Sequence, residues 1–217
     1  MRPLLIMVSD RQRVGHDGGH DAEIDALVAA AGRAARAGAT MIHVRERGLD
    51  DRILLEAAKR IRRETGDTAA RVLVNDRADI ALAAAADGVH LPSVGAAAPR
   101  VRAIAPAGFI IGRSVHSEAE AMAAEKSGGC DYLMFGTVFE SASKPAGHAI
   151  AGIEGLARVC AAVTLPVVAI GGIVAERAGE IARAGAAGIA AIGLFAQGQD
   201  EEIRARVRMI EDAFAVS

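Results

Sequence analysis

The sequence predicts a single α/β domain, residues 1–217, folded as a (β/α)8 TIM barrel. Short apolar runs alternate with segments of helical periodicity, the alternation repeats eight times, and no change of composition marks a linker. The length of 217 residues also lies within the range of about 200 to 250 residues that such barrels use. A doubly wound parallel sheet shares the alternation but more usually stops at about five or six strands, so it is the second choice.

The first half of the chain predicts four buried parallel strands, because each apolar run is short and ends abruptly in polar residues. These runs are residues 4–8, 40–44, 71–74 and 88–91. Between the first two, residues 11–21 read as a polar, glycine-rich loop, and a helix follows in which Ile24, Leu27, Val28 and Ala31 recur at helical spacing before Gly38. Further helices are expected from Asp51 and over residues 80–85.

The second half predicts four more strands, at residues 108–111, 132–135, 167–170 and 188–192. Helices are expected at about residues 100–104, 118–126, 153–162, 176–183 and 201–214. Ser117 is a suitable N-cap for the second of these, and Glu118 and Glu120 in its first turn favour the positive end of the helix dipole.

Charge and hydropathy exclude several classes of function. The net charge is −2 and the pI about 6.3, which provides no overall attraction to nucleic acid or to an anionic membrane. No apolar stretch approaches the roughly 20 residues of a membrane span. We therefore expect a cytoplasmic protein without nucleic-acid or membrane partners, and a homodimer is one candidate assembly.

Polar residues gather where the predicted strands end, and in a barrel all these ends share one face. The candidate site residues are Asp10, Arg45, Arg47, Asn75, Asp76, Ser93, Ser114, His116, Thr137, Ser141, Ser143, Lys144, Gly171, Gly172 and Gly193. Their concentration at one end of every strand predicts the ligand site.

The chemistry of this set predicts an anionic ligand. Arginine and lysine suit phosphate or diphosphate, and the amides of Gly171 and Gly172 could approach a phosphate closely because no Cβ intervenes. Gly193, after the eighth strand, completes the usual phosphate position of barrels. Side chains alternate along a strand, so His43 and Arg45 would both point into the barrel mouth.

Simpler interpretations compete with these. Arg45 and Arg47 could pair with Glu46 or neighbouring aspartates on a solvated loop, and the glycine pair could be only a turn. His90 lies within an apolar strand and is predicted to be a hydrogen-bonded structural histidine rather than a catalyst.

Six blocks in order resemble the thiamine phosphate synthase/TenI superfamily over nearly the whole chain. They are IHVRER at residues 42–47, VNDRADIAL at 74–82, DGVHLPS at 87–93, IGRSVHS at 111–117, AEKSGGCDYLMFGTVFE at 124–140 and PVVAIGGI at 166–173. The LPS and IGRSVHS forms, and His43 where the synthases usually have Gln, are more similar to the TenI branch.

The resemblance to the synthases implies that hydroxymethylpyrimidine diphosphate loses pyrophosphate and that a thiazole phosphate nitrogen attacks the resulting cation. By that pattern Arg45, Arg47 and Asn75 match diphosphate binders, and Asp76 matches a ligand of Mg²⁺. Ser114 matches a group near the reacting pyrimidine. The remaining matches are Ser141, Ser143 and Lys144 to a substrate loop, and Gly171 and Gly172 to the thiazole phosphate site.

Two positions depart from the family patterns. Gly95 stands where the synthases have their second magnesium carboxylate, and Thr137 stands where TenI tautomerases have their acid–base histidine. His43 and His116 are candidate replacements for that histidine. Three functions therefore remain: first a TenI-like protein, possessing or lacking tautomerase activity, that binds a thiazole phosphate; second a thiamine phosphate synthase using Mg²⁺; third a non-catalytic phosphate-ligand sensor.

Overall fold

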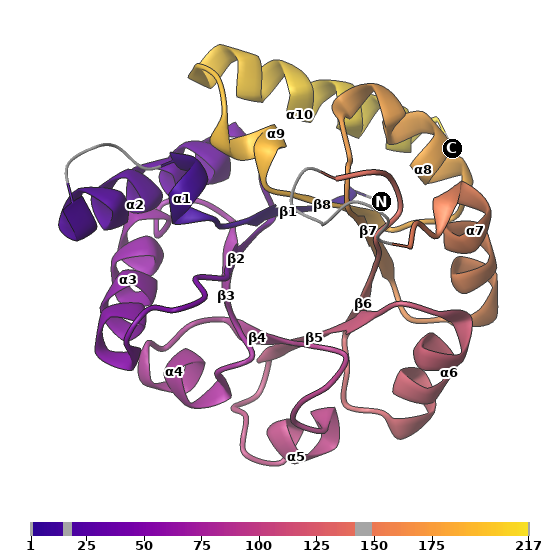
Figure 1. The fold of residues 1–217 in the computed structure, drawn as a ribbon, viewed down its shortest axis with the longest axis horizontal. Helices are drawn as coiled ribbons and strands as arrows, with labels where there is room; N and C mark the ends of the chain where they lie inside the picture. The colour runs from indigo at the N-terminus through magenta and orange to yellow at the C-terminus, as the bar shows by residue number, and fades with distance from the viewer. Residues whose placement is uncertain (1, 15–18, 142–148, 217) are drawn as a thin grey trace.

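The computed structural model describes residues 2–14, 19–141 and 149–216, and it confirms the predicted (β/α)8 barrel. All strand pairs are parallel, each strand pairs with its neighbours in chain order, and β1 closes the barrel against β8 (Figure 1). The strands are β1 (Leu4–Val8), β2 (Met41–Val44), β3 (Arg71–Asn75), β4 (Gly88–Leu91), β5 (Ile110–Val115), β6 (Tyr132–Phe135), β7 (Val167–Ile170) and β8 (Gly188–Ala191).

The helices form a ring outside the strands, as Figure 1 shows. Those described are α1 (Arg11–Val14), α2 (Gly19–Ala37), α3 (Asp51–Glu64), α4 (Ala78–Ala83), α5 (Ala98–Arg102), α6 (Glu118–Ser127), α7 (Gly152–Ala162), the 3-10 helix η1 (Ala175–Arg177), α8 (Ala178–Arg183), α9 (Gly193–Ala196) and α10 (Asp200–Ala215). Ser117 caps α6 as predicted, its hydroxyl accepting a hydrogen bond from the Glu120 amide.

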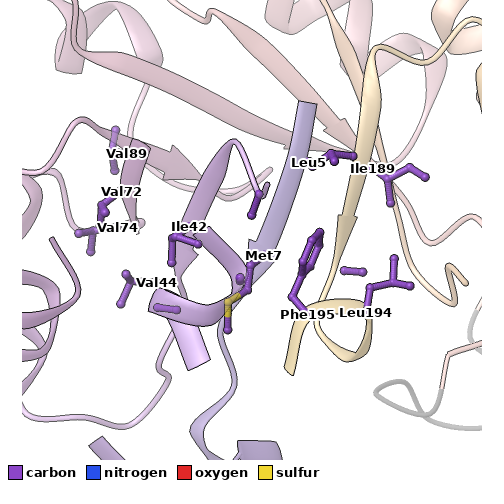
Figure 2. Close-up of a cluster of buried hydrophobic side chains, with 14 of the residues drawn as sticks. Leu5, Met7, Ile42, Val44, Val72, Val74, Val89, Ile189, Leu194 and Phe195 are labelled. Atoms are coloured by element: carbon purple, nitrogen blue, oxygen red, sulfur yellow. The ribbon is translucent and has the colours of Figure 1, made fainter. Parts of the chain in front are cut away.

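The alternation of side chains along each strand divides the apolar residues into two cores. Outward-facing residues of the strands pack against the helices; Figure 2 shows part of this cluster, with Leu5 and Met7 of β1 near Phe195 of α9. Inward-facing residues, including Ile6, Leu73 and Met134, fill the barrel itself. Each fully buried side chain of this size stabilises the fold by about 1.5 to 3 kcal/mol.

Two local predictions were wrong, and one short helix was missed. Residues 11–21 do not form only a loop, because α1 lies there and α2 already begins at Gly19. Strand β5 runs to Val115 rather than ending at residue 111. Its polar residues looked like the end of a strand, yet Ser114 belongs to the strand, and the short helix α9 after β8 was not predicted.

Strand β5 continues through the polar residues Arg113 and Ser114 because both side chains have hydrogen-bond partners. Arg113 faces away from the barrel interior and donates to the carbonyl oxygens of Ser93 and Ala96, each at 2.9 Å. These bonds connect the loop after β4 to β5. On the inner face of the strand, Ser114 lies within hydrogen-bond distance of His90.

No helix in the described ranges is long and apolar enough to span a bilayer.

Candidate active site at the barrel mouth

A row of inward-facing residues runs around the barrel below its mouth. The strand register pairs Asn75 with His90, His90 with Gly112, and Gly112 with Tyr132. Because these positions share one level and one face, the polar side chains among them can reach one another. Sequence reasoning did not single out Tyr132, although its alternation with Leu133 along the strand could have placed it on the inner face.

His43 lies inside the barrel as predicted, with only 2% of its surface exposed. Its Nε2 is 3.2 Å from Oδ1 of Asn75, so Nε2 carries the proton and donates to the amide oxygen. Burial, reinforced by the charge of Arg45, lowers the pKa of His43 to about 3. The ring is therefore uncharged at neutral pH, and its geometry is that of a group that orients Asn75.

His90 is a hydrogen-bonded histidine, which confirms the structural interpretation. Its Nδ1 lies 2.9 Å from the Tyr132 hydroxyl and its Nε2 lies 2.9 Å from Oγ of Ser114. The rings of His43 and His90 pack with centroids 4.6 Å apart. Burial lowers the pKa of His90 well below its ordinary value, so this ring too is neutral.

Glu46 faces away from the two arginines that flank it in sequence. Its carboxylate is buried, accepts a hydrogen bond of 2.5 Å from the Ser9 hydroxyl, and accepts two more from the backbone amide and guanidinium of Arg11. Ser9 in turn accepts from the backbone amide of Arg45 at 2.9 Å. Burial raises the pKa of Glu46 despite these donors. The competing interpretation, in which Glu46 pairs with Arg45 or Arg47, is therefore wrong.

Arg45 and Arg47 form a cationic pair at the mouth. Arg45 is half-buried and Arg47 is exposed, and within the described ranges neither guanidinium has a hydrogen-bonded or ion-paired partner. Burial, followed by the charge of Arg47, lowers the pKa of Arg45, while Asp10 and Glu46 oppose that effect. Because the charge of Arg47 already lowers the pKa of Arg45, an anion bound beside both side chains would be favourable.

Asp76 follows β3 at the same face and is exposed, with a left-handed backbone at φ 61°. A Cβ built on Gly95 would lie 3.3 Å from Asp76 Oδ1, so the two positions that the resemblance matches to magnesium carboxylates are adjacent. In the part of the chain that the structure describes, no three acidic, histidine or cysteine side chains form a metal-binding group. One carboxylate can still hold Mg²⁺ where a bound diphosphate supplies the other oxygens.

Gly171 and Gly172 follow β7 and both have positive φ values, 103° and 62°. A Cβ on Gly171 would lie 2.5 Å from Thr137 Cγ2, and one on Gly172 would lie 2.0 Å from the carbonyl oxygen of Glu140. The glycines are thus required by the loop after β6, which also donates from Phe139 to the Gly171 carbonyl oxygen at 3.0 Å. Their binding of a phosphate stays a prediction.

The other predicted residues lie on the same face or outside the described ranges. His116 is exposed directly after β5, and its Nδ1 donates to the Gly136 carbonyl oxygen at 2.6 Å. Gly193 begins α9, next to the glycine pair because β7 neighbours β8. Ser141 is half-buried at the end of the described part of the β6 loop, whereas Ser143 and Lys144 lie outside the described residues.

Known proteins match most of this chain in sequence and in fold. A family model described as thiamine monophosphate synthase matches residues 16–195. The thiamine-phosphate synthase of Methanoculleus marisnigri is 41% identical over 184 residues, 85% of this chain and 86% of that protein. The one of Chlorobium limicola is 42% identical over 174 residues, 80% of this chain and 82% of its own. The solved thiamine phosphate pyrophosphorylase of Pyrococcus furiosus superposes with a TM-score of 0.80 at 33% identity, covering 98% and 95% of the two chains.

These relatives bear on the ranking of functions made from sequence. The resemblance to the superfamily is confirmed, but the names of these relatives support the synthase, which was the second choice, and give no support to the tautomerase. Thr137, which the resemblance matches to the tautomerase histidine, is buried beside Gly171.

Proposed function

This chain belongs to the thiamine monophosphate synthase/TenI family, and from that premise we propose that it is a thiamine phosphate synthase. The substrates would be hydroxymethylpyrimidine diphosphate and a thiazole phosphate, and the products thiamine phosphate and pyrophosphate. The observation that carries the proposal is the cationic pair of Arg45 and Arg47, left without carboxylate partners among the described residues because Glu46 turns away.

The reaction needs positive charge where that pair lies. The bond between the pyrimidine methylene carbon and the diphosphate oxygen breaks, and its electron pair leaves with pyrophosphate. Arg45 and Arg47 stabilise the charge that develops on the departing group. The thiazole nitrogen then donates its lone pair to the methylene carbon, so one C–O bond is exchanged for one C–N bond.

Asn75 is oriented to assist the same anion. Its Oδ1 accepts from His43, which leaves the amide NH2 group to donate toward the diphosphate at the mouth. Asp76, which follows it, would hold Mg²⁺ together with diphosphate oxygens, and such an ion neutralises charge on a leaving pyrophosphate.

The thiazole phosphate is assigned to the loops after β7 and β8, where Gly171, Gly172 and Gly193 lie. Barrels commonly bind phosphate with these two loops and a short additional helix, here α9. On this assignment the thiazole phosphate lies at β7 and β8, and strand β1 separates it from β2 and β3, which carry the proposed diphosphate-binding residues.

The proposal is tested by incubating the purified protein with both substrates and Mg²⁺ and measuring thiamine phosphate and pyrophosphate. Stoichiometric formation of both products is expected, and binding of the substrates with no turnover would indicate the non-catalytic sensor instead. Arg45→Ala should lower kcat/KM by about 10²-fold or more. Arg71→Ala is the matched control: Arg71 begins β3 at the opposite end of the barrel and pairs at the surface with Asp87, so little change is expected.

A further inference from the structure

Three side chains, Tyr132, His90 and Ser114, form a hydrogen-bonded series that runs from the barrel interior to the proposed site. The Tyr132 hydroxyl lies 2.9 Å from His90 Nδ1, and His90 Nε2 lies 2.9 Å from Ser114 Oγ. Tyr132 and His90 are each at most 2% exposed, whereas Ser114 is half-buried at the upper end of β5. The chain therefore connects the barrel interior to the mouth.

Gly112 provides the space that this arrangement needs. A Cβ on Gly112 would lie 2.2 Å from Cζ and 2.4 Å from the hydroxyl oxygen of Tyr132, so the phenol ring occupies the volume that any other residue would fill. The ring is thereby held across the barrel interior, with its hydroxyl directed at His90.

The direction of the hydrogen bonds follows from the donors available. His90 is neutral because of its burial, so one ring nitrogen carries a proton and the other accepts. The Tyr132 hydroxyl has a single proton, and among the described residues its one hydrogen-bond partner is His90 Nδ1. If Nδ1 carried the proton, the Tyr132 hydroxyl proton would be buried with no acceptor, which is costly.

We infer that Tyr132 and His90 are positioning residues that make Ser114 a hydrogen-bond donor toward the bound substrate. Tyr132 donates to Nδ1, Nε2–H donates to Ser114 Oγ, and the Ser114 proton is the one left over, at the only member of the chain that is not fully buried. The substrate atom next to Ser114 must then be an acceptor, such as a ring nitrogen of the pyrimidine. The identity of that substrate rests on the proposed function, whereas the direction of the hydrogen bonds from Tyr132 to Ser114 does not.

The first experiment measures the direction without any substrate. Long-range ¹H–¹⁵N correlation spectra of protein carrying ¹⁵N-histidine report which ring nitrogen is protonated, and the His90 signals are assigned by their loss in His90→Gln. We expect a protonated Nε2 and a bare Nδ1 at pH 7.5. A protonated Nδ1 would overturn the inference even if the protein proves to be a synthase.

The second experiment is a double-mutant cycle on the proposed reaction, with Tyr132→Phe, Ser114→Ala and the combined variant. Tyr132→Phe should lower kcat/KM about 10-fold in the wild-type background and less than about 2-fold once Ser114 is alanine. Equal losses in both backgrounds would show that Tyr132 only supports the barrel. If Tyr132→Phe does not fold, the tautomer of His90 in the wild-type protein still tests the inference. If the wild-type protein shows no turnover, the proposed function is rejected but the inference about the hydrogen-bond direction is not.

Discussion

The Cβ position of Gly95 lies 3.3 Å from Oδ1 of Asp76, which makes these two residues neighbours across the loops that follow β3 and β4. Gly95 has no positive φ value, and the tightest contact of an added Cβ is 3.0 Å to Pro92 Cγ, a ring atom at the surface. A carboxylate can thus be placed beside Asp76 with only a small movement of its neighbours.

We therefore expect Gly95→Asp to strengthen the binding of Mg²⁺. A second carboxylate near the ion should contribute about 1.4 kcal/mol, which lowers the Mg²⁺ concentration for half-maximal synthase activity about 10-fold. The measurement is a titration of activity with Mg²⁺. Gly95→Asn is the control, with nearly the same shape but no charge; equal behaviour of the two variants would contradict a metal-binding role for this pair of positions.

The glycine pair after β7 offers a matched test of a steric requirement. Gly172 (φ 62°) and Gly152 (φ 68°) have similar left-handed backbones, but a Cβ on Gly172 meets the Glu140 carbonyl oxygen at 2.0 Å whereas one on Gly152 meets nothing within 4 Å. Both alanine variants carry the backbone cost of about 1 to 2 kcal/mol. Gly172→Ala should lose about 2 kcal/mol more in the free energy of unfolding, measured by urea denaturation, and a similar loss in both would mean that the loop yields easily.

The contact between Ser9 and Glu46 leads to a prediction about Arg45. Ser9→Ala removes the donor to a buried carboxylate and the acceptor of the Arg45 amide at once. Leaving these groups unpaired should cost about 1 to 3 kcal/mol of stability and raise KM for the diphosphate substrate, because the end of β2 is no longer held. Ser127→Ala is the control: its hydroxyl makes one local bond to the Ala124 carbonyl oxygen on α6, and its loss should change neither KM nor kcat.

The sequence predicts the orientation of a side chain well where alternation along its own strand determines it, and poorly where contacts with other segments determine it. Alternation along β2 correctly places His43 inside the barrel, and the same alternation puts Glu46 on the opposite side from Arg45 and Arg47. The orientation of Glu46 could therefore have been predicted from alternation. It was missed because a glutamate between two arginines suggests a solvated ion pair.

Other features depend on contacts between distant segments. The extension of β5 through Ser114 follows from partners on β4 and on the loop after it, and helix α1 is held by bonds between Arg11 and Glu46. Likewise, no local pattern shows that Gly112 makes room for the ring of Tyr132. The positions of strands and mouth residues are therefore predictable, while the orientation of the polar groups requires the register between strands.

The buried, neutral state of His43 predicts how stability depends on pH. Its pKa is about 3 in the folded protein against about 6.5 in the unfolded chain, so between these values the unfolded state binds more protons. Stability is then fully present above pH 6.5 and falls as the pH decreases toward 3, by about 1.4 kcal/mol per pH unit for this group. His90, whose pKa is also lowered, adds to the same trend. In His43→Gln the amide can still donate to Asn75, so the stability lost between pH 7.5 and pH 5.5, measured by urea denaturation, should be about 1.4 kcal/mol smaller in total than in the wild-type protein. An unchanged pH dependence in that variant would mean that His43 is protonated in the folded barrel, and that its bond to Asn75 survives with a charged ring.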